Sequence, residues 1–403
     1  MIGKAEIGER RREFAARFGR GREPDLYFAP GRVNLIGDHT DYNGGLVLPL
    51  AIAEGTCVLI RRKGAPPARL YSANTGWETE FDPREIVPRG DWTDYVRGVF
   101  FFLARSQGLP PPFDAMYFGD LPLEAGLSSS ASLEVATAIS SSSLGFRVDG
   151  EEAARIAWRA ENEFVGMSCG VMDQYAVSLS RAGHLMLLDC RTLQYDFVPF
   201  DLPGTSLVVG HTGVSRSLLD SPYNLRRREC ERALGLITAV VGPREDLSQV
   251  TLEEFEAVAR ALPEVPRMRA EHVLRENLRV RLAAECLRGD DPQGVGLLLN
   301  ESHASLRDLY EVSSPELDTL QEISLRQPGV LGCRMTGAGF GGCVISLIRD
   351  GSVREYLEKV PGLYRGVTGH DPLFIEASPS AGAKKLDKRT GSAPDTGHSA
   401  TAR

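Results

Sequence analysis

The chain has 403 residues, 42% of them hydrophobic and 25% charged, so it is long enough for two globular domains and too apolar for a disordered protein. Its net charge of −8 at pH 7 argues against a general nucleic-acid surface, because phosphate backbones attract basic patches. No stretch approaches the roughly 18 apolar residues that a membrane-spanning helix needs.

The first residues predict a surface helix and no export signal. Ile7, Phe14 and Phe18 recur near one face of a helix over residues 4–19, and Pro24 ends the pattern. Charged residues run through this segment, so it lacks the apolar core of a signal peptide. Seven scattered cysteines without a C-x-x-C pair fit a reducing compartment. We therefore expect a cytoplasmic protein.

Strand and helix patterns mix over the rest of the first half. Short apolar runs between glycines and prolines predict strands, and apolar residues at helical spacing predict helices. The expected strands cover 26–29, 46–53, 57–62, 68–73 and 184–190. The expected helices cover about 92–107, 130–143 and 151–165.

The second half opens on an expected strand at 205–214 and then becomes mainly helical. Helices are expected over 223–241, 252–262, 266–288 and 314–327, and strands over 330–336, 343–348 and 371–377. Strands and helices do not alternate strictly, so the pattern predicts an α+β fold in two halves. We expect these halves to be residues 1–199 and 200–383. Residues 384–403 have almost nothing to bury, which predicts a disordered tail.

The stretch "GLSSSASLEVATAIS", residues 126–140, predicts an anion site. A glycine and three serines open a helical pattern, which leaves free backbone N–H groups and the positive end of a helix dipole at one point. An ordinary serine cap would explain one serine, but three exceed what capping needs. The stretch is not a Walker A loop, because G-x-x-x-x-G-K-[ST] occurs nowhere in the chain.

A second glycine cluster, "TGAGFGGC", matches G-x-G-x-x-G at Gly337, Gly339 and Gly342. A dinucleotide site would require a helix directly after the glycines, whereas "CVISLI" is typical of a strand. We therefore expect a tight hairpin, or glycines that let the backbone approach a ligand or loop closely.

The third cluster holds Glu161, Glu163 and Asp173. Surface carboxylates are one interpretation, but the neighbours of Asp173 are apolar, and a buried carboxylate needs a partner or a task. Arg32 is a plausible partner. An anion-binding helix, carboxylates for a divalent cation and a carboxylate–arginine pair are the parts that phosphoryl transfer requires.

With these clusters together, the sequence resembles the galactokinases of the GHMP small-molecule kinase superfamily. "PGRVNLIGDHTDYNGG" looks like the galactokinase signature, "GLSSSAS" like the superfamily phosphate loop and "RMTGAGFGGC" like its third motif. The resemblance runs from about Leu26 to Ala383. It implies a two-domain GHMP kinase fold, with a ribosomal protein S5 domain 2-like N-terminal domain, a ferredoxin-like α+β C-terminal domain and an active site in the interdomain cleft.

The activity that this resemblance implies is ATP-dependent phosphorylation of the C1 hydroxyl of α-D-galactose to galactose 1-phosphate. Asp173 and Arg32 match the catalytic pair. Ser130 and Glu161 match positions expected to hold Mg²⁺, with Glu163 as the alternative carboxylate. The phosphate loop supplies the implied nucleotide contacts Gly126, Leu127, Ser128, Ser129, Ser130, Ala131 and Ser132.

Sugar and adenine contacts follow from the same resemblance. Asp38, His39, Asp41, Gly170 and Tyr223 match residues that contact galactose. Trp92 and Tyr95 match aromatic residues around the adenine, although their spacing alone would indicate simple helix packing. The implied partners are small molecules, galactose and ATP, without nucleic acid or membrane, for a monomer or weak homo-oligomer.

Departures from the family pattern leave alternatives open. Galactokinases usually carry Glu where Asp38 stands, and the shorter side chain keeps a kinase for N-acetylgalactosamine or arabinose in consideration. Glu124 stands beside the phosphate loop, where a glycine is usual. A non-catalytic galactokinase-like sugar sensor is a further alternative, but the phosphate loop is uninterrupted. Structural roles are expected for His184, His211, His272 and His303, because they share no metal-ligand spacing.

Overall fold

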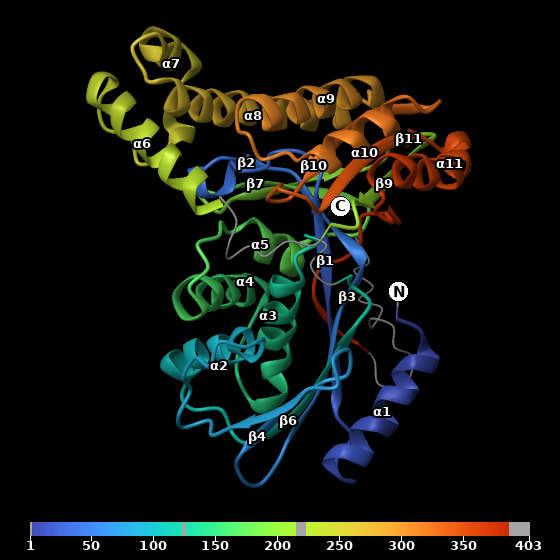
Figure 1. Cartoon of the computed structure of the whole chain (residues 1–403). Helices are drawn as coiled ribbons and strands as arrows, with labels where there is room; N and C mark the ends of the chain where they lie inside the picture. Colours follow the sequence, from blue (N-terminus) through green and yellow to red (C-terminus); the bar gives the residue numbers. More distant parts are fainter. Residues whose placement is uncertain (1, 123–125, 215–222, 387–403) are drawn as a thin grey trace, which may run out of the picture.

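The computed structural model describes residues 2–122, 126–214 and 223–386. Their strands form three sheets, and helices cover the two larger ones, which is the α+β architecture expected from the sequence (Figure 1). None of the helices in these ranges is long and apolar enough to cross a membrane. Glu124, which the sequence analysis placed beside the phosphate loop, lies outside the described residues.

A six-stranded sheet organises the first half of the chain. Its order is β13 (Lys384–Leu386), β1 (Asp25–Asn34), β3 (Pro49–Arg62), β6 (Phe113–Gly119), β4 (Ala68–Ser72) and β5 (Glu78–Phe81). Successive strand residues point to opposite faces, so Leu26 packs toward α1 (Lys4–Phe18) while Tyr27 packs toward the helices of the other face. Those helices are α2 (Thr93–Gln107), α3 (Ser129–Ser140), α4 (Gly150–Arg159) and α5 (Met172–Leu179) (Figure 1).

A four-stranded sheet organises the second half. Its order is β10 (Val330–Thr336), β11 (Cys343–Arg349), β9 (Thr205–His211) and β12 (Leu373–Ala377). The helices of this half are α6 (Tyr223–Val241), α7 (Leu252–Ala259), α8 (Glu264–Arg288), α9 (Pro292–Asp308), α10 (Pro315–Leu325) and α11 (Asp350–Thr368). A small sheet of β2 (Leu46–Val47), β7 (His184–Asp189) and β8 (Tyr195–Pro199) completes the set within the described ranges.

One hydrophobic cluster joins the two halves. It contains Val33 and Leu48 from the first half together with Leu207, Val280 and Ile345 from the second, all fully buried. Burial of apolar surface is the main favourable term in folding, so this shared cluster holds β1 and the segment after it against the second half. The signature at residues 30–45 therefore lies where the halves meet.

Most predicted elements are present, with corrections at particular places. The helix expected over 223–241 is α6, and the glycine cluster at 337–342 connects β10 to β11 as an antiparallel hairpin. The tail prediction was wrong for residues 384–386, because β13 pairs with β1 and Leu386 is buried. The helix expected over 151–165 changes into a π-helical segment at Ala160–Val165. Helices α5, α9 and α11 and strands β5, β6 and β8 were not predicted.

Candidate active site

Asp173 and Arg32 form the centre of the candidate site. Asp173 lies in the first turn of α5, and Arg32 lies near the end of β1. The guanidinium donates through Nε to Oδ1 and through Nη2 to Oδ2 of Asp173, each at 2.7 Å. Burial lowers the pKa of Arg32, but the charge of Asp173, its hydrogen bonds to the guanidinium and the charges of Asp38 and Asp41 together outweigh this effect and raise the pKa, so the arginine stays cationic. The Asp173 side chain remains 27% exposed, which leaves it accessible to a ligand.

The phosphate loop meets this pair directly. Ser128 precedes α3 at φ 61°, a left-handed conformation that is rare for a residue other than glycine. Its hydroxyl makes no capping hydrogen bond and instead donates to Asp173 Oδ2 at 2.5 Å. Arg32 Nη1 donates to the carbonyl of Gly126 at 2.8 Å. The strained residue thus connects the helix N-terminus to the Asp173–Arg32 pair.

The side chains of the loop divide into two groups. Ser129 and Ser130 are half-buried and lie in the first turn of α3. Ser132 is fully buried and donates to the Ala29 carbonyl, and Leu127 and Ala131 pack into hydrophobic clusters. These three side chains support the loop, and a phosphate would meet them only through backbone groups.

A buried carboxylate lies beside Ser130. Glu161 is 8% exposed; burial and then the Asp173 charge raise its pKa to about 7, although a hydrogen bond with Ser130 opposes the rise. Gln174 donates to Glu161 at 2.5 Å and to Glu134 at 3.5 Å. Glu163 instead pairs with Arg159 on the exposed side, away from this cluster. The structure thus brings Glu161, rather than Glu163, next to the phosphate loop.

Asp41 and Gly170 lie against each other, and Asp41 is near enough to Asp173 to be affected by its charge. A Cβ atom at Gly170 would lie 2.0 Å from Asp41 Oδ2, so the carboxylate occupies space that only glycine leaves free. Burial, followed by the charge of Asp173, raises the pKa of Asp41 to about 7. Hydroxyl donors from a sugar would relieve this desolvation of the carboxylate.

Aromatic rings surround His39. Its ring lies 5.8 Å from the ring of Tyr42, 5.7 Å from Tyr223 and 4.8 Å from Tyr310. His39 Nδ1 is hydrogen-bonded to the Tyr42 hydroxyl at 2.8 Å, which in turn contacts the Tyr310 hydroxyl at 2.8 Å. The imidazole is therefore held from both halves of the chain. Tyr42 and Tyr310 were missed by the sequence analysis, although Tyr42 lies inside the quoted signature.

The remaining predicted residues lie around this centre. The Asp38 carboxylate is buried against Arg334, which the sequence analysis did not single out. Trp92 packs edge-on against Tyr117 at 5.8 Å between ring centroids, as a helix-packing residue would. Tyr95 lies close enough to Glu161 for that charge, after burial, to raise its pKa to about 12. His272 and His303 are buried and hydrogen-bonded to neighbouring groups.

Family models match three parts of the chain, and curated relatives align with most of its length. The model of the galactokinase galactose-binding signature matches residues 12–62, and those of the GHMP kinase N-terminal and C-terminal domains match residues 94–181 and 283–365. The galactokinase of Fusobacterium nucleatum is 39% identical over 93% of this chain and 98% of its own length. The galactokinase of Bacillus subtilis is 40% identical, over 93% and 97%.

Solved structures give the same relationship. The structure of Lactococcus lactis galactokinase complexed with galactose superposes with a TM-score of 0.89 at 36% identity, covering 94% of this chain and all of that one. Mevalonate kinase of Methanococcus jannaschii has a TM-score of 0.61 at 16% identity, over 91% and 100% of the two chains. At that identity the second match shows the fold alone.

Proposed function

The chain belongs to the galactokinase family of the GHMP kinases, and we propose that it transfers the γ-phosphoryl group of ATP to the C1 hydroxyl of α-D-galactose. The observation that carries this proposal is the position of Asp173, whose carboxylate contacts both Arg32 and the hydroxyl of Ser128. A hydrogen bond therefore links Asp173, the proposed proton acceptor, to Ser128 at the anion-binding N-terminus of α3. Phosphoryl transfer needs these groups within a few ångströms of each other.

The mechanism follows from the charges at this point. The amides at the start of α3 and the half-buried hydroxyls of Ser129 and Ser130 would bind the terminal phosphates. Asp173 would accept a hydrogen bond from the C1 hydroxyl, aim its oxygen at the γ-phosphorus and take its proton as the new P–O bond forms. The bond from the γ-phosphorus to the bridging oxygen breaks at the same time, and ADP leaves with that oxygen. Arg32 would orient the Asp173 carboxylate and stabilise the negative charge that spreads over the transferring group.

We propose that Ser130 and Glu161 hold Mg²⁺. A hydroxyl and a carboxylate are oxygen donors of the kind that this hard cation prefers, and the two side chains are already hydrogen-bonded. No cluster of three or more His, Cys, Asp or Glu side chains suited to a metal occurs in the part of the chain that the structure describes, so water and phosphate oxygens would complete the coordination. When bound, the ion would neutralise phosphate charge.

The sugar would bind between Asp41, His39, Gly170 and Tyr223. Each sugar hydroxyl buried without a partner is costly, so a pocket with a carboxylate, an imidazole and a phenol favours polyhydroxylated ligands. Trp92 and Tyr95 would lie on the adenine side. We further propose a cytoplasmic monomer or weak homo-oligomer that acts on small molecules, because the net charge of −8 and the scattered cysteines support neither nucleic acid nor an oxidising compartment.

A substrate panel tests the proposal. ADP release is measured at fixed ATP with galactose, N-acetylgalactosamine, arabinose and glucose, and we expect galactose to give the highest kcat/KM. Faster turnover of N-acetylgalactosamine or arabinose would assign the protein to a related sugar instead. Absence of ADP release with every sugar, from protein that still binds galactose, would favour the non-catalytic sensor.

A further inference from the structure

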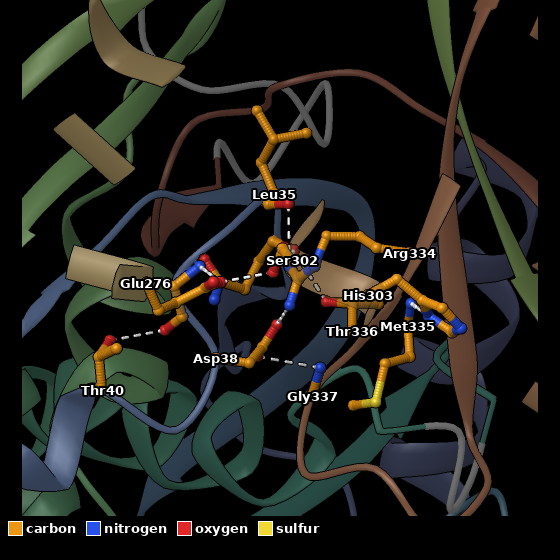
Figure 2. Close-up of polar contacts among 12 residues, drawn as sticks. Leu35, Asp38, Thr40, Glu276, Ser302, His303, Arg334, Met335, Thr336 and Gly337 are labelled. Carbon is orange, nitrogen blue, oxygen red and sulfur yellow. Dashed lines mark hydrogen bonds and ion pairs between the residues drawn. The ribbon is translucent and has the colours of Figure 1, made fainter. Parts of the chain in front are cut away.

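Arg334 reaches from the second half of the chain into the signature segment. It lies on β10 and is fully buried. Its Nη1 donates to the carbonyls of Leu35 at 2.9 Å and Asn34 at 3.3 Å, and its Nη2 forms an ion pair with Asp38 (Figure 2). A guanidinium presents its donors in a rigid planar fork, so these contacts together fix the path of the chain from Asn34 to Asp38.

Residues of the second half also form hydrogen bonds with the other carboxylate oxygen and the main-chain carbonyl of Asp38. Its Oδ1 accepts a hydrogen bond from the Gly337 amide at 3.1 Å, and its main-chain carbonyl lies 3.2 Å from His272 Nε2. Only 2% of the side chain is exposed. Figure 2 shows the Asp38 side chain directed toward Arg334 and Gly337. The carboxylate therefore already has protein partners on both oxygens.

Asp38 and its partner Gly337 lie next to the segments that carry the proposed sugar and phosphate contacts. His39 directly follows Asp38 in the chain and Asp41 comes two residues later, so the position of Asp38 sets where this segment begins. On the other side, a Cβ at Gly337 would lie 3.5 Å from the Gly126 carbonyl, the oxygen to which Arg32 donates. Gly337, whose amide donates to Asp38, thus lies close to the phosphate loop.

We propose that Arg334 is a positioning residue of the sugar site, and that Asp38 is its anchor rather than a ligand of the sugar. The inference rests on the proposed function, because galactose is taken as the ligand. The pair holds the start of the segment that carries His39 and Asp41, so sugar affinity depends on the pair as a unit. Removing one partner leaves a buried charge without its counterpart, whereas removing both leaves a neutral contact.

A double-mutant cycle on galactose binding tests this inference. Galactose and ATP are titrated calorimetrically into the wild type, Asp38→Asn, Arg334→Met and the double variant. We expect each single variant to bind galactose about tenfold or more weakly, with ATP binding within about threefold of wild type. The double variant should bind galactose no more weakly than the weaker single variant.

Two results would overturn the inference. If Asp38 contacts the sugar itself, Asp38→Asn weakens galactose binding while Arg334→Met leaves it within about threefold of wild type. If the two residues act independently, their losses multiply in the double variant. Should Arg334→Met fail to fold, Arg334→Gln replaces it in the cycle under the same criteria, because the glutamine amide removes the charge and still offers hydrogen-bond donors.

Asp114→Asn provides the control for a general loss of stability. Asp114 is 1% exposed and ion-paired with Arg61 and Arg69 in the sheet of the first half. Asp114→Asn should lower the melting temperature without changing the Kd for galactose. If it changed that Kd as much as Asp38→Asn does, the proposal that Arg334 and Asp38 position the sugar site would be contradicted. Wild-type protein that binds no galactose would instead contradict the proposed function, which separates the two failures.

Discussion

At the scale of single residues, the absent side chain of Gly170 gives Asp41 its place. A Cβ there would lie 2.0 Å from Asp41 Oδ2 and 2.3 Å from its Cγ. We predict that Gly170→Ala displaces the carboxylate and weakens galactose binding about tenfold or more, with ATP binding unchanged, since an unpaired sugar hydroxyl is costly. Calorimetric titration measures both.

The matched control for this change is Gly235→Ala. Gly235 lies on the exposed side of α6 with open space where its Cβ would be. It should leave galactose affinity unchanged. Equal affinities in Gly170→Ala and Gly235→Ala would show that the Asp41 carboxylate has no part in binding the sugar.

His272 gives the protein a defined dependence on pH. Burial, partly opposed by the charge of Glu276, lowers its pKa from 6.5 to about 4. The unfolded chain then binds more protons, so the contribution of His272 to stability is complete above pH 6.5 and is lost as the pH falls toward 4. We predict that the wild type loses about 3 kcal/mol more than His272→Gln over this range, measured by urea unfolding.

The neighbouring groups set the pH range of that comparison. Burial raises the pKa of Glu276, but the charges of Arg279, His272 and Arg334 lower it to about 2. The contribution of Glu276 to stability is therefore lost only as the pH falls below 4.5, the ordinary pKa of a glutamate. Between pH 6.5 and 5, Glu276 therefore adds nothing to the difference in stability between the wild type and His272→Gln. Parallel stability curves for the wild type and His272→Gln across that interval would be inconsistent with a buried neutral imidazole.

At the scale of elements, the hairpin between β10 and β11 depends on glycine for two different reasons. Gly337 and Gly339 both have positive φ, 84° and 73°. A Cβ at Gly339 would lie 2.1 Å from the backbone oxygen of Val312, whereas at Gly337 the nearest atom is 3.5 Å away. Gly337 needs only conformational freedom, and Gly339 also needs space.

We predict different costs for the two alanine variants of this loop. Gly337→Ala should lose about 1 kcal/mol of unfolding free energy from backbone strain. Gly339→Ala should lose at least about 2 kcal/mol more, because the backbone must shift and the 2.6 Å hydrogen bond from Phe340 N to Val312 O weakens. Urea unfolding gives both values, and equal losses would refute the close-approach argument.

Elements predicted from sequence and those missed differ in how local their signals are. Helix α6 follows its apolar spacing, so its bounds were predicted. Helix α11 contains Pro361 and three glycines, which oppose helix formation, yet its buried residues Val353, Tyr356, Val360 and Tyr364 hold it against the sheet. Helix α9 carries an Asp291 cap and Pro292 at its first position, a start signal that could have been recognised.

At the scale of the whole molecule, motifs were predictable and their long-range partners were not. The phosphate loop, Asp173 and Arg32 could be singled out because each lies in a dense local pattern. The pairing of Asp38 with Arg334 joins residues 296 positions apart, and no local pattern encodes it. It arises because the shared core brings β1 and β10 together. The sequence therefore identified the candidate functional residues, but it did not reveal the partner of Asp38 from a distant part of the chain.

The central claim concerns the junction of the two catalytic elements, in which the loop before α3 and the Asp173–Arg32 pair act as one unit. Its most direct test is the turnover number of Asp173→Asn with saturating galactose and ATP, with ATP binding measured on the same preparation. The account predicts a loss of about 10²-fold or more in kcat with ATP binding retained, because the amide cannot take the proton. Turnover near that of the wild type would contradict it.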